Sequence, residues 1–167
     1  MAWEKFTKKE TKDKESWVSA KVSYMDSVSV DSSNDWYFRI EGKKHILPIQ
    51  NICRATRSQE EEEYLLNNRE VAIILKPTGK IRKFFRIPSV IPETLTYYSK
   101  GLVAGISKTR EEVVSFTVGG PFADSEFSIA NYTVSARLDD CEDIYAEDGL
   151  LYALYAEGVC VMEPIEI

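Results

Sequence analysis

The sequence has few of the residues that carry most metal and nucleophile chemistry. Its 167 residues include one histidine, His45, and three cysteines, Cys53, Cys141 and Cys160. An odd number of widely spaced cysteines argues against a disulfide framework and is typical of a reducing compartment, so we expect a cytoplasmic protein. A closed zinc site would have to gather these four residues from distant segments. We therefore expect no zinc site and assign no metal-ligating residue, with His45 on a surface or strand edge.

Motifs for nucleophilic catalysis and for phosphate binding are also absent. The sequence contains no Gly-x-Ser-x-Gly, no Gly-x-x-x-x-Gly-Lys-Ser/Thr and no Gly-x-Gly-x-x-Gly. We therefore expect no cofactor and favour a protein without enzymatic activity. The longest apolar run, residues 150–156, is too short to cross a bilayer, and the first residues lack the apolar stretch of a signal peptide. These features predict neither membrane contact nor export.

Glycine and proline, at 8 and 6 residues, are too few for a fibrous or disordered chain. The hydrophobic fraction of 44% is enough for one well-buried core in a chain of this length. Residues 7–15 form a mixed-charge run without apolar periodicity. We therefore expect a solvated, charged lead-in over residues 1–15 and a single domain over residues 16–167.

Positive charge is scarce at one end of the chain. Residues 111–167 contain one basic residue, Arg137, against 13 acidic ones, whereas residues 1–110 contain 20 basic residues against 14 acidic ones. The two parts therefore carry +6 and −12, for a net charge of −6. A separation of this size determines which partners each surface attracts, so we expect complementary basic and acidic surfaces.

Runs with β-strand character recur along most of the chain and are separated by turn-forming residues. They are residues 17–24, 27–30, 36–40, 44–49, 71–75, 81–87, 113–118 and 127–138. Residues 150–155 and 159–162 are expected to form a C-terminal hairpin. Leu151, Leu154 and Tyr155 also fit helical spacing, but the β-branched residues of Val159-Cys160-Val161 favour the hairpin. The expected fold class is mainly β, with α+β as a variant, in an antiparallel sandwich or a partly open barrel.

One helix is expected, over residues 58–67. Ser58 lies three residues before Glu61, as in a capping box, and strong helix formers follow until Asn67. A second short helix over residues 93–100 is an alternative to irregular structure. We expect the capped helix to pack over one end of the β domain.

The best candidate binding site is the expected hairpin over residues 76–86. Strict alternation predicts that Arg82, Phe84 and Arg86 share one face, with the ring between two guanidinium groups. Such a face can stack a nucleic-acid base and hold phosphates. Alternatively, Phe84 packs under arginine side chains in an ordinary sheet, and the net negative charge opposes phosphate binding. The candidate residues for nucleic-acid or partner binding are Lys80, Arg82, Lys83, Phe84 and Arg86.

The acidic segment over residues 139–148 is the second candidate and is expected to be a loop or a frayed helical turn. Its carboxylates are suitable ligands for Ca²⁺ or Mg²⁺, but their order does not match an EF-hand loop. A run of like charge more often faces solvent or a partner. We therefore expect partner binding by Asp139, Asp140, Glu142, Asp143, Glu147 and Asp148, and a divalent cation site stays open.

The function expected from these features is a non-enzymatic binding or assembly module that docks through its basic and acidic surfaces. A head-to-tail homo-oligomer is the simplest version, because one chain supplies both halves of the interface. Two alternatives stay open. One is a single-stranded nucleic-acid-binding protein that uses the hairpin over residues 76–86. The other is a small metal-dependent hydrolase that uses the acidic segment.

Overall fold

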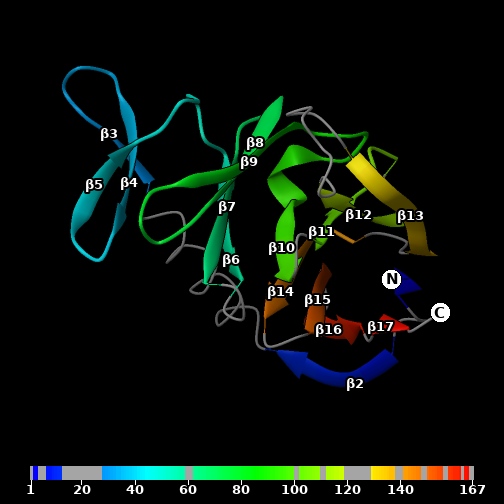
Figure 1. The fold of residues 1–167 in the computed structure, drawn as a ribbon. Coiled ribbons are helices and arrows are strands. Elements are labelled where there is room, and N and C mark those ends of the chain that lie inside the picture. Colours follow the sequence, from blue (N-terminus) through cyan, green and yellow to red (C-terminus); the bar gives the residue numbers. More distant parts are fainter. Residues whose placement is uncertain are drawn as a thin grey trace.

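The computed structural model of the chain describes residues 2–3, 7–12, 28–58, 62–99, 102–109, 112–118, 129–137, 141–147, 150–155, 158–162 and 164–165. This part of the chain forms β-strands and one short 3₁₀ helix, so the expected mainly β fold is confirmed. Four antiparallel sheets of three or four strands follow one another along the chain (Figure 1), with one additional two-stranded ladder. The strand expected over residues 17–24 lies outside the described residues. No helix within the described ranges has the length and apolar character needed to span a membrane.

The first sheet has the strand order β3-β4-β5, with β3 over Val28–Val30, β4 over Trp36–Ile40 and β5 over Lys43–Ile46. The turn between β4 and β5 has two residues, Glu41 and Gly42, both with positive φ. Lys43 therefore belongs to β5 and pairs with Ile40, whereas the sequence placed it in a three-residue turn. A two-residue turn of this kind matches the natural twist of a hairpin. Strand β5 lies at the edge of this sheet, and Pro48, which has no backbone N–H to donate, follows it.

The second sheet has the order β6-β7-β8-β9, with β6 over Arg54–Ser58, β7 over Glu63–Asn67, β8 over Val71–Leu75 and β9 over Ile81–Arg86. The expected capped helix over residues 58–67 is wrong, because Ser58 ends β6 and Asn67 ends β7. Leu65 and Leu66 are both buried but belong to core clusters on opposite faces of the sheet. A strand can bury side chains on both of its faces in this way, and the free energy gained by that burial outweighs the local helix propensity.

The predicted hairpin between β8 and β9 is confirmed. The turn over residues 76–79 is closed by the Gly79 N–H, which donates to the Lys76 carbonyl at 2.8 Å. Next to it, Ile81 pairs with Leu75, whereas Lys83 pairs with Ile74. Arg82 is therefore the extra residue of a β-bulge, which interrupts the alternation of side chains along β9.

The third sheet has the order β10-β11-β12-β13, with β10 over Thr96–Ser99, β11 over Leu102–Ile106, β12 over Glu112–Val118 and β13 over Ile129–Arg137. The strands expected at residues 113–118 and 127–138 are thus confirmed. The helix suggested over residues 93–100 is wrong. Only the 3₁₀ helix η1, Pro92–Thr94, forms there, because β10 follows and pairs with β11.

The fourth sheet has the order β14-β15-β16-β2, with β14 over Asp143–Glu147, β15 over Leu150–Tyr155, β16 over Gly158–Met162 and β2 over Thr7–Lys12. The favoured C-terminal hairpin, β15 with β16, is confirmed. Strand β2 lies in the segment that was expected to be a solvated lead-in. It can still pair with β16, because the hydrogen bonds between strands use only backbone groups. The ladder β1–β17 pairs Ala2–Trp3 with Pro164–Ile165. The domain division at residue 15 stays a prediction.

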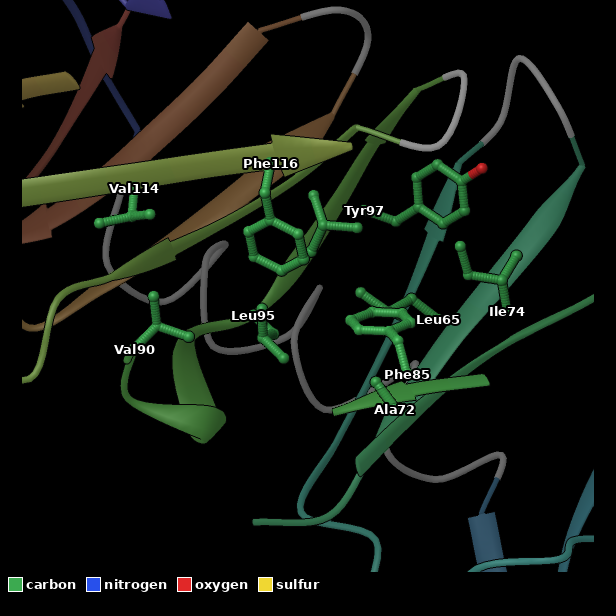
Figure 2. Close-up of a cluster of buried hydrophobic side chains, with 10 residues drawn as sticks. Leu65, Ala72, Ile74, Phe85, Val90, Leu95, Tyr97, Val114 and Phe116 are labelled. Carbon is green, nitrogen blue, oxygen red and sulfur yellow. The ribbon is translucent and has the colours of Figure 1, made fainter. Parts of the chain in front are cut away.

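Shared apolar layers join the four sheets in sequence. The outer core lies between the first and second sheets and includes Phe38, Ile40, Leu66, Ile73, Leu75 and the half-buried Phe84. The central core joins the second sheet to the third, and Figure 2 shows it, with Phe85 and Phe116 facing each other at 5.8 Å between ring centroids. The C-terminal core joins the third sheet to the fourth through residues such as Ile106, Val113, Ile144 and Leu151.

Candidate functional site

The five residues expected in the basic binding site do not form one surface. Lys80 and Arg86 are exposed, and Lys83 is half-buried. Phe84 packs against the outer core, so its ring is partly used in holding the first and second sheets together. This matches the alternative in which Phe84 is an ordinary packing residue of the sheet.

Arg82 is held by an internal network. Its Nε donates to Oε2 of Glu63, and Nη2 lies 3.3 Å from the Tyr97 hydroxyl. That hydroxyl donates to Oε1 of Glu63 at 2.9 Å. Burial opposes the charge on Arg82, but the hydrogen bonds and charge interactions with Glu63 and Tyr97 together outweigh it, and the pKa of Arg82 is raised above its ordinary value. Arg82 therefore compensates a carboxylate that is 4% exposed.

The predicted pairing of Phe84 with two arginines on one face is wrong. Phe84 pairs with Ile73, and both lie on the outer-core face of the second sheet. Arg82 bonds instead to Tyr97, which belongs to the central core on the opposite face. The bulge at Arg82 causes this reversal, because it inserts one residue between Ile81 and the regular part of β9.

A basic patch forms where β5 meets the turn between β8 and β9. A Cβ on residue 79 would collide with Nδ1 and Cε1 of the His45 ring, so the imidazole lies directly against Gly79. Gly79 has φ +90, a conformation that favours glycine. The contact places the turn that carries the exposed Lys76 and Lys80 against β5, in which the exposed Lys43 lies two positions before His45. We define the basic patch as Lys43, Lys76 and Lys80.

The lysines of the basic patch have no internal counter-charge among the described residues. Ion pairs in this part of the chain involve Lys44, Arg54, Arg69 and Arg82. Glu41, in the turn before Lys43, is the nearest carboxylate in sequence and is exposed. The patch therefore presents three cationic groups to solvent, whereas the neighbouring Lys44 is paired with Asp31.

The acidic segment is not a loop over residues 143–147, where it forms β14. Asp143 is 4% exposed, and its carboxylate accepts a hydrogen bond from Nη1 of Arg54 in β6. A surface partner cannot reach a carboxylate in that position. Glu142 is exposed and Glu147 is half-buried. Asp139, Asp140 and Asp148 lie outside the described residues.

Sequence reasoning missed the outward face of the first sheet. We call it the Tyr37 face, and it consists of Tyr37, Arg39, Lys44 and Ile46. Arg39 Cζ lies 5.3 Å and Lys44 Nζ 4.5 Å from the centroid of the Tyr37 ring. The two-residue turn between β4 and β5 could have revealed this face, because the register that it sets places Tyr37 opposite Ile46 and Arg39 opposite Lys44.

Cys53 and Cys141 are free cysteines. Burial raises the pKa of Cys53 to about 11 and that of Cys141 to about 12. Within the described ranges, no group of three or more histidine, cysteine, aspartate or glutamate side chains is placed to hold a metal ion.

The comparisons with known proteins give no family for this chain. No model of a protein family matches the sequence, and the search of curated proteins returned no match.

Proposed function

We propose that the chain is a non-enzymatic binding or assembly module that docks through charge onto an acidic surface of a second copy. The observation that carries this proposal is the contact of His45 with Gly79, which gathers the basic patch from two sheets. Complementary charge steers the association of two proteins and fixes their relative orientation. A surface whose charges are not paired within its own chain keeps its electrostatic potential.

The acidic half of the interface is assigned to the segment around the exposed Glu142. Residues 111–167 supply 13 of the 27 acidic residues of the chain and one basic residue, so a second copy offers the opposite charge. A contact between two different surfaces of identical chains is head-to-tail. The resulting assembly stops at a ring if the rotation between neighbouring copies closes, and otherwise continues as a filament.

The fold proposed for this module is an antiparallel sandwich. The edge-to-face contact of Phe85 with Phe116 across the central core supports it, because two sheets pack face to face there (Figure 2). Layers on both faces of the second and third sheets bury side chains continuously. The rigid layers would hold the basic patch in a fixed position relative to the acidic segment.

Light scattering on a triple variant tests the proposal. K43Q/K76Q/K80Q removes the basic patch without adding apolar surface, and we expect its mass at low salt to be that of the monomer when the wild type forms larger species. The matched control is Lys108→Gln, because Lys108 is also exposed but lies in a different turn. An unchanged mass distribution in the triple variant would reject this surface as the interface.

A further inference from the structure

The Tyr37 face is a surface that the packing of the sheets does not use. The opposite face of the same hairpin carries Phe38 and Ile40, which are 1% and 3% exposed in the outer core. On the Tyr37 face, Arg39 and Lys44 are exposed, and Ile46 is 55% exposed, the most of any large hydrophobic side chain described. Figure 1 shows this sheet at one end of the molecule.

The chemistry of this face combines an aromatic ring, an aliphatic side chain and two cations within one hairpin. Proteins that bind single strands use an aromatic side chain to stack a base and cationic side chains to follow the backbone. The carboxylates of an acidic peptide would pair with the ammonium and guanidinium groups but would leave the aromatic ring without an aromatic stacking partner. The combination therefore favours a nucleobase with flanking phosphates.

We propose that the Tyr37 face binds single-stranded nucleic acid. Arg39 and Lys44 leave their positions over the Tyr37 ring to hold one phosphate each, and one base stacks on the ring in their place, with Ile46 at its edge. This inference goes beyond the proposed function and does not depend on it, because it uses none of the residues of the basic patch.

Asp31 controls the availability of Lys44. Its Oδ2 accepts a hydrogen bond from Lys44 Nζ at 2.7 Å, and this bond lowers the pKa of the Asp31 carboxyl. The other oxygen, Oδ1, accepts from the N–H groups of Ser33 and Asp35 at 2.9 and 3.0 Å and closes the preceding turn. A phosphate must therefore compete with Asp31 for Lys44. Asp31→Asn retains an acceptor for the turn and removes the competing charge.

The test is fluorescence anisotropy with a labelled oligothymidylate at low salt. The wild type should bind, and Tyr37→Leu, which keeps apolar bulk but loses the ring, should weaken binding about tenfold. Tyr37→Phe should bind within about twofold of the wild type, because the stacking surface remains. With two phosphate contacts, the slope of log K against log salt should be about −1.4. Thermal melting verifies that each variant is folded.

Two further variants separate stacking from general electrostatics. Asp31→Asn should bind about two- to fivefold more tightly, since Lys44 is released. Arg39→Gln should weaken binding, whereas Arg69→Gln should not, because Arg69 is exposed but pairs with Glu93 elsewhere. No binding by the wild type would overturn the proposal. Equal affinity of Tyr37→Leu and the wild type, or displacement of the oligonucleotide by polyglutamate with no effect of Tyr37→Leu, would also overturn it in favour of an acidic partner.

Discussion

Arg54 of β6 and Asp143 of β14 form an ion pair across 89 positions of sequence, and both side chains are almost completely buried. Arg54 also donates from Nη1 to the Glu93 carbonyl and from Nη2 to the Ile144 carbonyl at 2.6 Å. One guanidinium group thus links the second sheet, the 3₁₀ helix η1 and the fourth sheet. This is why the most acidic part of the chain contributes a carboxylate to the interior.

Removal of one partner of this pair should be strongly destabilising. Arg54→Met leaves the Asp143 carboxylate buried without its counter-charge, and we expect a loss of about 3–5 kcal/mol in the free energy of unfolding. Urea denaturation gives the value. The double variant R54M/D143L should recover part of the loss, because it removes both charges. A double variant less stable than either single variant would contradict this account.

Gly79 should not tolerate a side chain. Gly79→Ala combines a positive φ with a collision against His45, so we expect a destabilisation of about 1–3 kcal/mol, measured by thermal unfolding. His45→Ala in the same chain should relieve the collision but not the backbone strain. If G79A/H45A is no more stable than G79A, His45 does not lie against the turn as described here.

The bulge in β9 predicts different costs for neighbouring substitutions. Arg82→Leu should lose about 1–3 kcal/mol, because it removes the cation that is paired with the buried Glu63 carboxylate. Lys83→Gln, at the next position, should change the free energy of unfolding by less than about 0.5 kcal/mol. Equal effects of the two variants in denaturant titrations would show that Arg82 is not the internally paired residue.

The thiols should react slowly and affect stability only at high pH. Burial raises the pKa of Cys53 to about 11 and of Cys141 to about 12 from an ordinary value of 9.0, so both are neutral at pH 7. Between pH 9 and about 11, the unfolded chain loses these protons and the folded chain keeps them, so stability should fall as pH rises. Alkylation followed by mass spectrometry should modify Cys53 and Cys141 quickly only in denaturant. Rapid modification of Cys141 in the folded protein would be inconsistent with its burial.

Much of the sheet structure could be predicted from local patterns, whereas the side-chain arrangement could not. The turn at Pro77 and Gly79 and the C-terminal hairpin follow from turn chemistry and β-branched residues. The segment from Ser58 to Asn67 has helical composition, and only burial on both faces of a sheet makes it a strand. A single bulge at Arg82 made the predicted face of β9 wrong. Side chains alternate between the two faces of a strand, so one inserted residue moves the residues beyond it to the opposite face.

The charged sites depended most on contacts that the sequence does not reveal. Asp143 looked like part of an exposed acidic run, but its partner is Arg54 in another sheet. Lys43 and Lys80 lie close in sequence to His45 and Gly79, whose contact the sequence does not reveal. The charge separation along the sequence is therefore only partly present on the surface, because several charged side chains are paired inside the fold and others are exposed.

Sedimentation velocity at low and high salt tests the central claim most directly. The wild type should self-associate with rising concentration at low salt and dissociate at high salt, since exposed charges are screened there. K76E/K80E, which reverses two charges of the basic patch, should sediment as a monomer under both conditions. A wild-type protein that stays monomeric at low salt and high concentration would contradict the proposal that the basic patch docks onto a second copy.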